Sequence, residues 1–87
     1  MIVVLDFENI KSKEEFYNYL NNTFKFEEYV NNLDFLYDQL CCFLEEIEIQ
    51  IINVNVLKEV LDNSFKGFIN LLDDVNEECE NIKIVIK

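Results

Sequence analysis

The chain has 87 residues, of which 18 are acidic, seven are Lys and none is Arg or His, giving a formal net charge of −11 at pH 7. This length predicts one small domain with a thin core, and a hydrophobic content of 51% excludes a disordered chain. The charge argues against nucleic acid as a partner, which requires a basic footprint, and an anionic membrane surface would repel the protein. It favours a basic protein partner, although negative charge can also serve solubility alone.

The first expected elements are a strand and a capped helix. Residues 2–5, IVVL, form a β-branched run that predicts a buried strand. Ser12 and Glu15 have the spacing of a capping box, in which the serine accepts from the backbone N–H three residues on and the glutamate reaches back. We therefore expect a helix to begin after Ser12.

A second helix is expected after Asn32, a favourable N-cap residue. Apolar residues then recur at helical spacing and predict one buried stripe: Leu33, Leu36, Leu40, Phe43 and Leu44. With a turn of about 100° per residue, Asp34 and Asp38 fall on the adjacent outer flank, and Phe35 points away from the stripe. Like charges one turn apart weaken a helix slightly, so these two carboxylates call for another explanation.

Two further strands and two further helices complete the chain. Residues 46–52 and 82–87 alternate apolar with polar side chains, which predicts strands with one covered face. Between them we expect a short helix near residues 56–61 and a longer one with the apolar stripe Phe65, Phe68, Leu72, Val75 and Cys79.

This order of elements predicts an α/β fold with a three-stranded parallel sheet, because helical crossovers join parallel strands. Alternation in two of the strands indicates that the helices cover one face only, which gives two layers. Right-handed crossovers that all lie on one face require the strand order 1-2-3. Residues 1–87 would then form a single domain.

The three cysteines are Cys41, Cys42 and Cys79. Because their number is odd and two are adjacent, we expect free thiols in a reducing cytoplasm rather than a disulfide framework. Without His or a CxxC motif, no metal or other cofactor is expected. We recognise no signal peptide, and no apolar run approaches the roughly 18 residues of a membrane span, so neither export nor a membrane is expected.

Catalysis has little support in this sequence. No His is present to act as a general base near neutral pH, and no Gly-rich phosphate loop occurs. Asp34 and Asp38 could form a carboxylate pair, but acids at this spacing on a surface helix usually form a solvated face. We therefore expect a protein that is not an enzyme.

The segment YVNNLDFLYD carries a more specific signal. It resembles the barstar family, whose segment reads as a tyrosine pair, a glycine, an acidic residue, Asn-Leu-Asp, a variable residue and Leu-Trp-Asp. The residues that match in register are Asn32, Leu33, Asp34, Leu36 and Asp38. The likeness extends over almost the whole chain, through the opening strand, the long last helix and the closing IKIVIK. Departures stand at Glu28, Val30, Phe35, Tyr37 and Asp74, where the family has an aromatic, a glycine, a small residue, a tryptophan and a glutamate.

Barstars are intracellular inhibitors of secreted ribonucleases, so the resemblance implies both a fold and a function. It implies a three-stranded parallel sheet covered by helices, and an acidic helix that enters the enzyme's active site in place of substrate phosphates. The preceding loop, neighbouring aromatic residues and one acid of the last helix complete the surface. By position, the partner-binding roles fall on Tyr29, Asn31, Asp34, Tyr37, Asp38 and Asp74. Phe35 is expected to join them as a neighbouring aromatic anchor.

Two functions therefore remain open. The first is a cytoplasmic inhibitor that forms a 1:1 complex with a basic secreted ribonuclease or related toxin. The second is an acidic interaction module that docks on a basic protein other than a nuclease.

Overall fold

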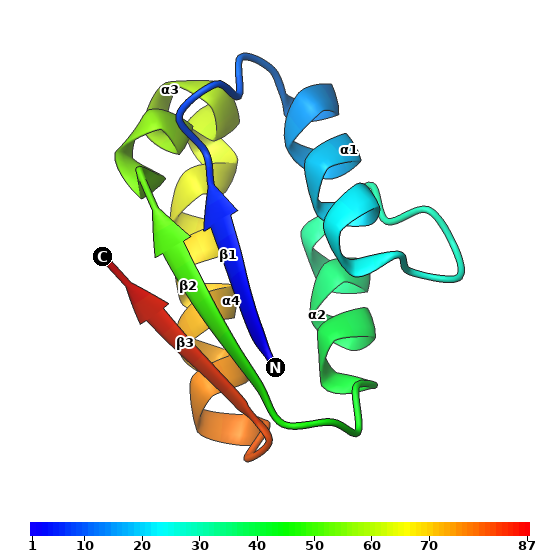
Figure 1. Cartoon of the computed structure of the whole chain (residues 1–87). Helices are drawn as coiled ribbons and strands as arrows, with labels where there is room; N and C mark the ends of the chain where they lie inside the picture. The colour runs from blue at the N-terminus through cyan, green and yellow to red at the C-terminus, as the bar shows by residue number, and fades with distance from the viewer.

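The computed structural model describes all 87 residues. The elements are β1 (Ile2–Asp6), α1 (Lys13–Phe24), α2 (Leu33–Cys41), β2 (Ile47–Ile52), α3 (Leu57–Leu61), α4 (Phe65–Glu78) and β3 (Ile82–Ile86), with single 3-10 turns before and after α3. The three strands form one parallel sheet in the order β1-β2-β3 (Figure 1), so the predicted fold class and strand order are confirmed.

The central strand β2 shows which face of the sheet is covered. Its isoleucines at alternate positions are buried, whereas Glu48 and Gln50 between them are partly exposed. Ile49 pairs with Val3 of β1 and with Ile84 of β3, and these residues form a row on the covered face. Helix α4 lies behind the strands in Figure 1, and the face toward the viewer carries no helix.

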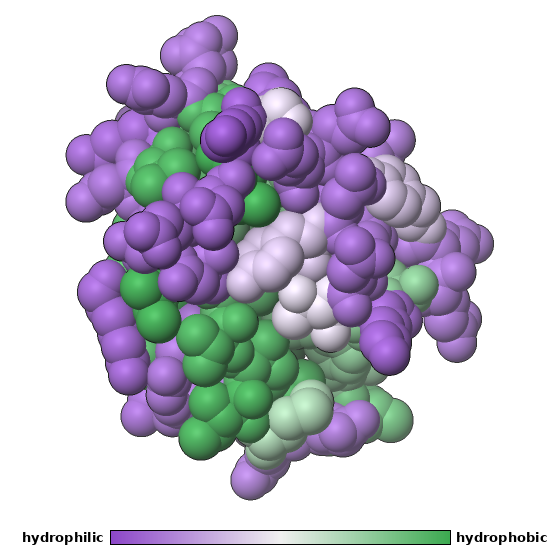
Figure 2. All heavy atoms as spheres, turned by 45° about the horizontal axis from the view of Figure 1, so that its top comes forward, coloured by the Kyte–Doolittle hydropathy of each residue, from purple (hydrophilic) through white to green (hydrophobic).

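Strand β1 is less buried than its sequence predicts. Ile2 and Val4 are 65% and 48% exposed, because they point to the face of the sheet that no helix covers. Apolar side chains gather in the lower half of Figure 2, on the side where the strands lie in front of α4. The uninterrupted apolar run of β1 contains no polar residue to mark its open face, so the prediction of a fully buried strand is wrong.

Both predicted helix starts are confirmed. The Ser12 hydroxyl accepts from the Glu15 N–H at 3.1 Å, and the Glu15 carboxylate accepts from the Lys11 N–H at 3.2 Å. The Asn32 side chain accepts from the Phe35 N–H at 2.8 Å and begins α2. Each cap satisfies a backbone donor that the first turn of a helix leaves without a partner.

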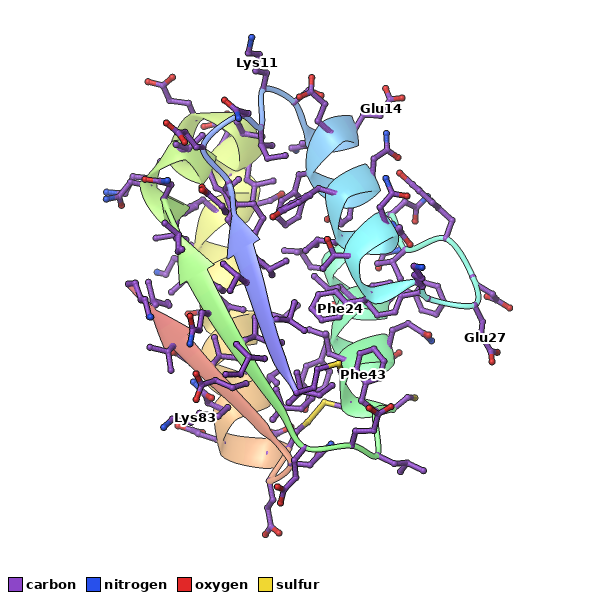
Figure 3. The ribbon with its side chains drawn as sticks, viewed as in Figure 1. Lys11, Glu14, Phe24, Glu27, Phe43 and Lys83 are labelled. Atoms are coloured by element: carbon purple, nitrogen blue, oxygen red, sulfur yellow. A yellow bond between two sulfur atoms is a disulfide. The ribbon has the colours of Figure 1, made fainter.

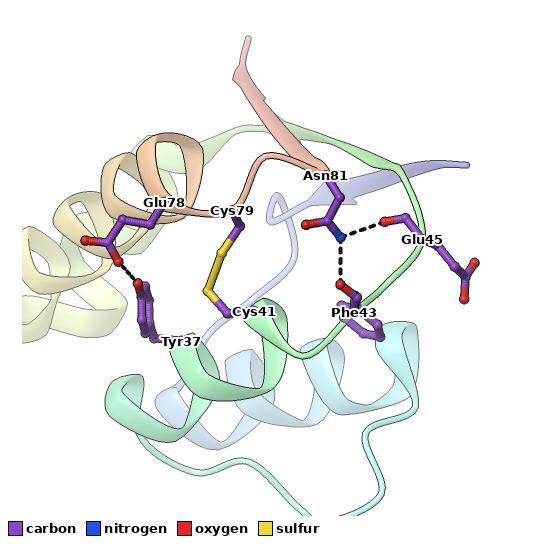
Figure 4. Close-up of a disulfide and its surroundings, with 7 residues drawn as sticks. All are labelled: Tyr37, Cys41, Phe43, Glu45, Glu78, Cys79 and Asn81. Carbon is purple, nitrogen blue, oxygen red and sulfur yellow. Dashed lines mark hydrogen bonds between the residues drawn. A yellow bond between two sulfur atoms is a disulfide. The ribbon is translucent and has the colours of Figure 1, made fainter.

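Helix α2 ends earlier than its apolar stripe predicts. It stops at Cys41, and Leu44, expected in the buried stripe, is 94% exposed. The Asn81 side chain donates to the carbonyl oxygens of Phe43 and Glu45, at 2.6 and 2.8 Å, and holds this segment in a non-helical path toward β2 (Figure 4). The spacing of apolar residues in α2 cannot predict these hydrogen bonds, because they come from a residue far along the chain.

The core beneath the sheet contains three fully buried phenylalanines from different elements. The ring centroid of Phe68, on α4, lies 5.1 Å from that of Phe16 on α1 and 6.2 Å from that of Phe7 after β1. Both pairs meet edge to face, the geometry that aromatic quadrupoles favour. This contact fixes α4 relative to the rest of the domain.

The expectation of three free cysteines is wrong. Cys41, the last residue of α2, and Cys79, which caps α4, form a disulfide with Cα atoms 6.0 Å apart, and only Cys42 is free. The two cysteines are 38 residues apart in the chain. They meet because α2 and α4 lie side by side and end at the same level, an arrangement that residue spacing alone cannot reveal.

Candidate functional site: an acidic groove between two helices

A groove runs between α2 and α4, the two helices that carry the predicted acids. Its nine lining residues are Leu33, Asp34, Tyr37 and Asp38 from α2, and Gly67, Asn70, Leu71, Asp74 and Glu78 from α4. At one end of the groove the helices approach closely, since a Cβ atom on Gly67 would lie 3.2 Å from the Leu33 side chain. The glycine, unfavourable in a helix by propensity, is explained by this contact.

The groove brings four carboxylates together. Asp34 and Asp38 lie one turn apart on α2, and Asp74 and Glu78 lie one turn apart on α4. All four side chains are exposed, and no cationic side chain lines the groove. Such a surface repels anions and presents several acceptors to a cationic partner.

Tyr37 lies between the two pairs of acids. Its hydroxyl donates a hydrogen bond to the Glu78 carboxylate across the groove (Figure 4). This bond is the main cause that raises the pKa of Tyr37 to about 12, followed by burial and by the charges of Glu78, Asp74 and Asp38. The Tyr37 hydroxyl is thus held more firmly in its protonated, hydrogen-bonding form than the hydroxyl of a free tyrosine, which is also protonated at neutral pH.

A second depression continues the groove beyond the start of α2. Asn31, Asn32, Leu33 and Asp34 line it from one side. The other side is lined by Lys13 and Tyr17 of α1, Leu61 of α3 and Ser64. Leu33 and Asp34 line both hollows, so the two hollows adjoin at the start of α2. The predicted loop residue Asn31 and the predicted helix residue Asp34 thus lie in the same hollow.

The loop before α2 is fixed to α1 by its backbone. Val30 is fully buried, its N–H donates to the Asn21 side chain, and its carbonyl oxygen accepts from the same side chain, both at 2.8 Å. The next residue back, Tyr29, is 53% exposed and donates from its hydroxyl to Asn18 at 2.5 Å. At the far end of the loop, Phe26 stacks on Phe24, 5.4 Å between centroids, near Phe43 (Figure 3).

These contacts predict that Asn21→Ala destabilises the free protein by about 1–3 kcal/mol, because the buried amide and carbonyl of Val30 lose their partners. Asn22→Ala is the matched control, since Asn22 is the exposed neighbour in the same helix and gains the same helix propensity. Urea unfolding measures both free energies, and hydrogen exchange should show faster exchange of the Val30 amide only in Asn21→Ala. Equal stability of the two variants would contradict this role for Asn21.

The structure places the predicted site residues in three positions. Asp34, Tyr37, Asp38 and Asp74 line the groove, Asn31 lines the adjoining depression, and Tyr29 stands exposed on the loop. Phe35 lies in neither hollow and is half-buried against the core, so its expected outward position is wrong.

Glu78 was missed in the sequence although a signal existed. It follows Asp74 by four residues on the same helix, which is the spacing of neighbouring side chains on one face. Its position opposite Tyr37 became evident only from the packing of α4 beside α2.

Other chemistries find no support in the arrangement of side chains. No group of three or more His, Cys, Asp or Glu residues is placed to hold a metal ion. None of the helices combines the length and the apolar character needed to cross a bilayer. The site is a concave surface lined by four acidic side chains and by no cationic one.

A family model described as Barstar (barnase inhibitor) matches residues 1–87, the whole chain. The chain belongs to the barstar family. A search of curated proteins gave no significant match. The family is one of inhibitors, and the barstar fold of the chain places the acids of α2 and α4 in one groove.

Proposed function

We propose that this barstar-family protein inhibits a basic ribonuclease, or a related toxin, by blocking its active site with the acidic helix α2, which lines the groove, and with the preceding loop. The observation that carries the proposal is the convergence of four carboxylates, without a cation, in one groove of a chain that matches the barstar family throughout. The complex is expected to be 1:1 and to form in the cytoplasm, before the enzyme can act on the cell's own RNA.

The chemistry of a ribonuclease active site supports this role. Such sites hold phosphate groups with cationic side chains, and carboxylates pair with the same groups through charge-assisted hydrogen bonds. Asp34 and Asp38 supply acceptors from one side of the groove, and Asp74 supplies them from the other. Tyr37 between them adds a rigid aromatic surface of the kind enriched at interface centres. The barnase–barstar complex is itself the standard example of such charge pairing across an interface.

The charge of the groove predicts that association depends strongly on salt. Steering by complementary charge raises on-rates by about 10- to 1000-fold at low ionic strength, and salt screens it over a Debye length of about 8 Å at physiological strength. Stopped-flow mixing with the partner at increasing NaCl should therefore show a steep fall in on-rate with a smaller change in off-rate. An on-rate that is the same in low and high salt would contradict steering by the acidic groove.

Capture of the partner tests the proposed function. Wild-type protein and the Asp34→Asn/Asp38→Asn variant are immobilised separately, and lysate and culture medium of the source cell are passed over both. We expect the wild type alone to retain a basic protein with ribonuclease or toxin activity. A retained protein that is basic but has neither activity would instead favour an acidic interaction module.

A further inference from the structure

Two cross-links join α2 and α4 at the same end of the acidic groove. The Tyr37 hydroxyl bonds to Glu78, and one helical turn further along α2 the Cys41–Cys79 disulfide joins the helices covalently. Figure 4 shows the two links side by side. Cys79 directly follows Glu78, so the disulfide anchors the backbone that carries one of the four acids.

The two ends of the groove are held differently. At the Leu33 end, close packing against Gly67 holds the helices together. At the other end, Asp38 and Glu78 carry like charges, and the disulfide is the covalent link there. Repulsion between carboxylates on opposite walls favours separation of the helices, and the disulfide opposes that separation.

We propose that the Cys41–Cys79 disulfide is a positioning element for partner binding, which holds the acid pairs of α2 and α4 at one spacing and makes affinity depend on the thiol redox state. This inference rests on the proposed function, because it concerns the same groove. With the disulfide intact, the carboxylates are preorganised; without it, the partner must first bring the helix ends together against their repulsion.

The redox step balances with an ordinary thiol reductant. Two thiol groups supply two electrons and two protons, the Sγ–Sγ bond breaks to give two thiols, and the reductant becomes a disulfide. Cytosolic disulfides are usually transient or redox-sensing, so this bond would respond to the thiol poise of the cell. The free thiol of Cys42 is exposed beside Cys41 but is not required for this role.

Coupling between the disulfide and the partner must be reciprocal. Coupling free energies between two sites typically correspond to a factor of about 5 to 150 in affinity, and we expect reduction to weaken binding by a factor in this range. The bound partner should then make the disulfide harder to reduce by the same factor. A disulfide that served stability alone would produce neither effect.

The first measurements use the free protein. Thiol counting in denaturant should find one reactive thiol without dithiothreitol and three with it. After reduction, amide exchange should accelerate in residues 38–42 and 75–79 while the region around Leu33 and Gly67 stays protected. Three reactive thiols before reduction, or unchanged exchange after it, would overturn the proposal.

The second measurement is binding of barnase, the enzyme named in the family description, by calorimetry with and without dithiothreitol. Wild type and Cys42→Ser should both lose affinity for barnase on reduction. Cys41→Ser/Cys79→Ser should bind barnase weakly, with the same affinity in the presence and absence of dithiothreitol. If the double variant does not fold, the affinities of oxidised and reduced wild type still show whether the disulfide affects binding. Circular dichroism of both forms verifies that they are folded. If the oxidised and reduced forms bind barnase with equal affinity, the role of the disulfide is overturned and the proposed inhibition stands. If the oxidised wild type does not bind barnase, both the role of the disulfide and the proposed inhibition of a barnase-like enzyme are overturned.

Discussion

Asp38→Asn is expected to weaken partner binding by about 2–5 kcal/mol, because it leaves a buried cation of the partner without its counter-charge. This is the general range for buried interfacial charge pairs, of which barnase–barstar is the standard example. At 1.4 kcal/mol per tenfold, this is a loss of about 30-fold or more in affinity. The free protein should be unchanged or more stable by a few tenths of a kcal/mol, since Asp38 lies one turn from Asp34 and in the same groove as Asp74 and Glu78. The helix dipole, which favours Asp34 in the first turn of α2, contributes much less at Asp38.

Asp73→Asn is the matched control for this prediction. Asp73 is an exposed acid on α4 beside Asp74, but it does not line the groove. Both variants change the net charge equally, so a general loss of electrostatic attraction affects them alike. Calorimetric titration against the partner and urea unfolding of the free variants make the comparison. Equal affinities of the two variants would contradict a binding role for Asp38, and a clearly destabilised Asp38→Asn would indicate a structural role instead.

Phe68→Ala is expected to destabilise the fold by about 3–5 kcal/mol, the usual cost of removing a buried phenylalanine. Phe68 is only 2% exposed and holds α4 against the rings of Phe7 and Phe16. Small domains have about 5–15 kcal/mol of stability in total, so this single substitution would remove a large part of it. Urea unfolding followed by circular dichroism measures the loss.

Phe65→Ala provides the comparison for the core prediction. Phe65 lies on the same helix, but its side chain is only half-buried, so a clearly smaller loss is expected. A loss below about 1 kcal/mol for Phe68→Ala would mean that the site collapses around the missing ring, and that the aromatic cluster does not fix α4.

Local patterns explain how much of the fold could be predicted. The alternation around Glu48 and Gln50 reveals which face of β2 is covered, because side chains in a strand point to opposite faces in turn. Ser12 and Asn32 mark the helix starts, since their side chains bond to amides only three residues away. The strand order then follows from the handedness of crossovers rather than from any single residue.

Apart from the exposed face of β1, which its uninterrupted apolar run does not mark, the errors concern contacts between residues far apart in the chain. Leu44 fits the periodicity of α2, but Asn81 redirects its backbone from 38 and 36 residues away. Phe35 is half-buried because it packs against the core, and the sequence of α2 alone does not reveal that contact. For the same reason, the pairing of Cys41 with Cys79 and the place of Glu78 in the groove required the packed helices.

Titration of the captured ribonuclease with this protein tests inhibition by the acidic groove most directly. RNA cleavage should fall in proportion to added wild type and reach its floor at one equivalent. The Asp34→Asn/Asp38→Asn variant, at the same ratio and after its fold has been verified by circular dichroism, should leave most of the activity. Full cleavage by an enzyme saturated with the wild-type protein would contradict inhibition, and equal inhibition by the variant would contradict the groove as the inhibitory surface.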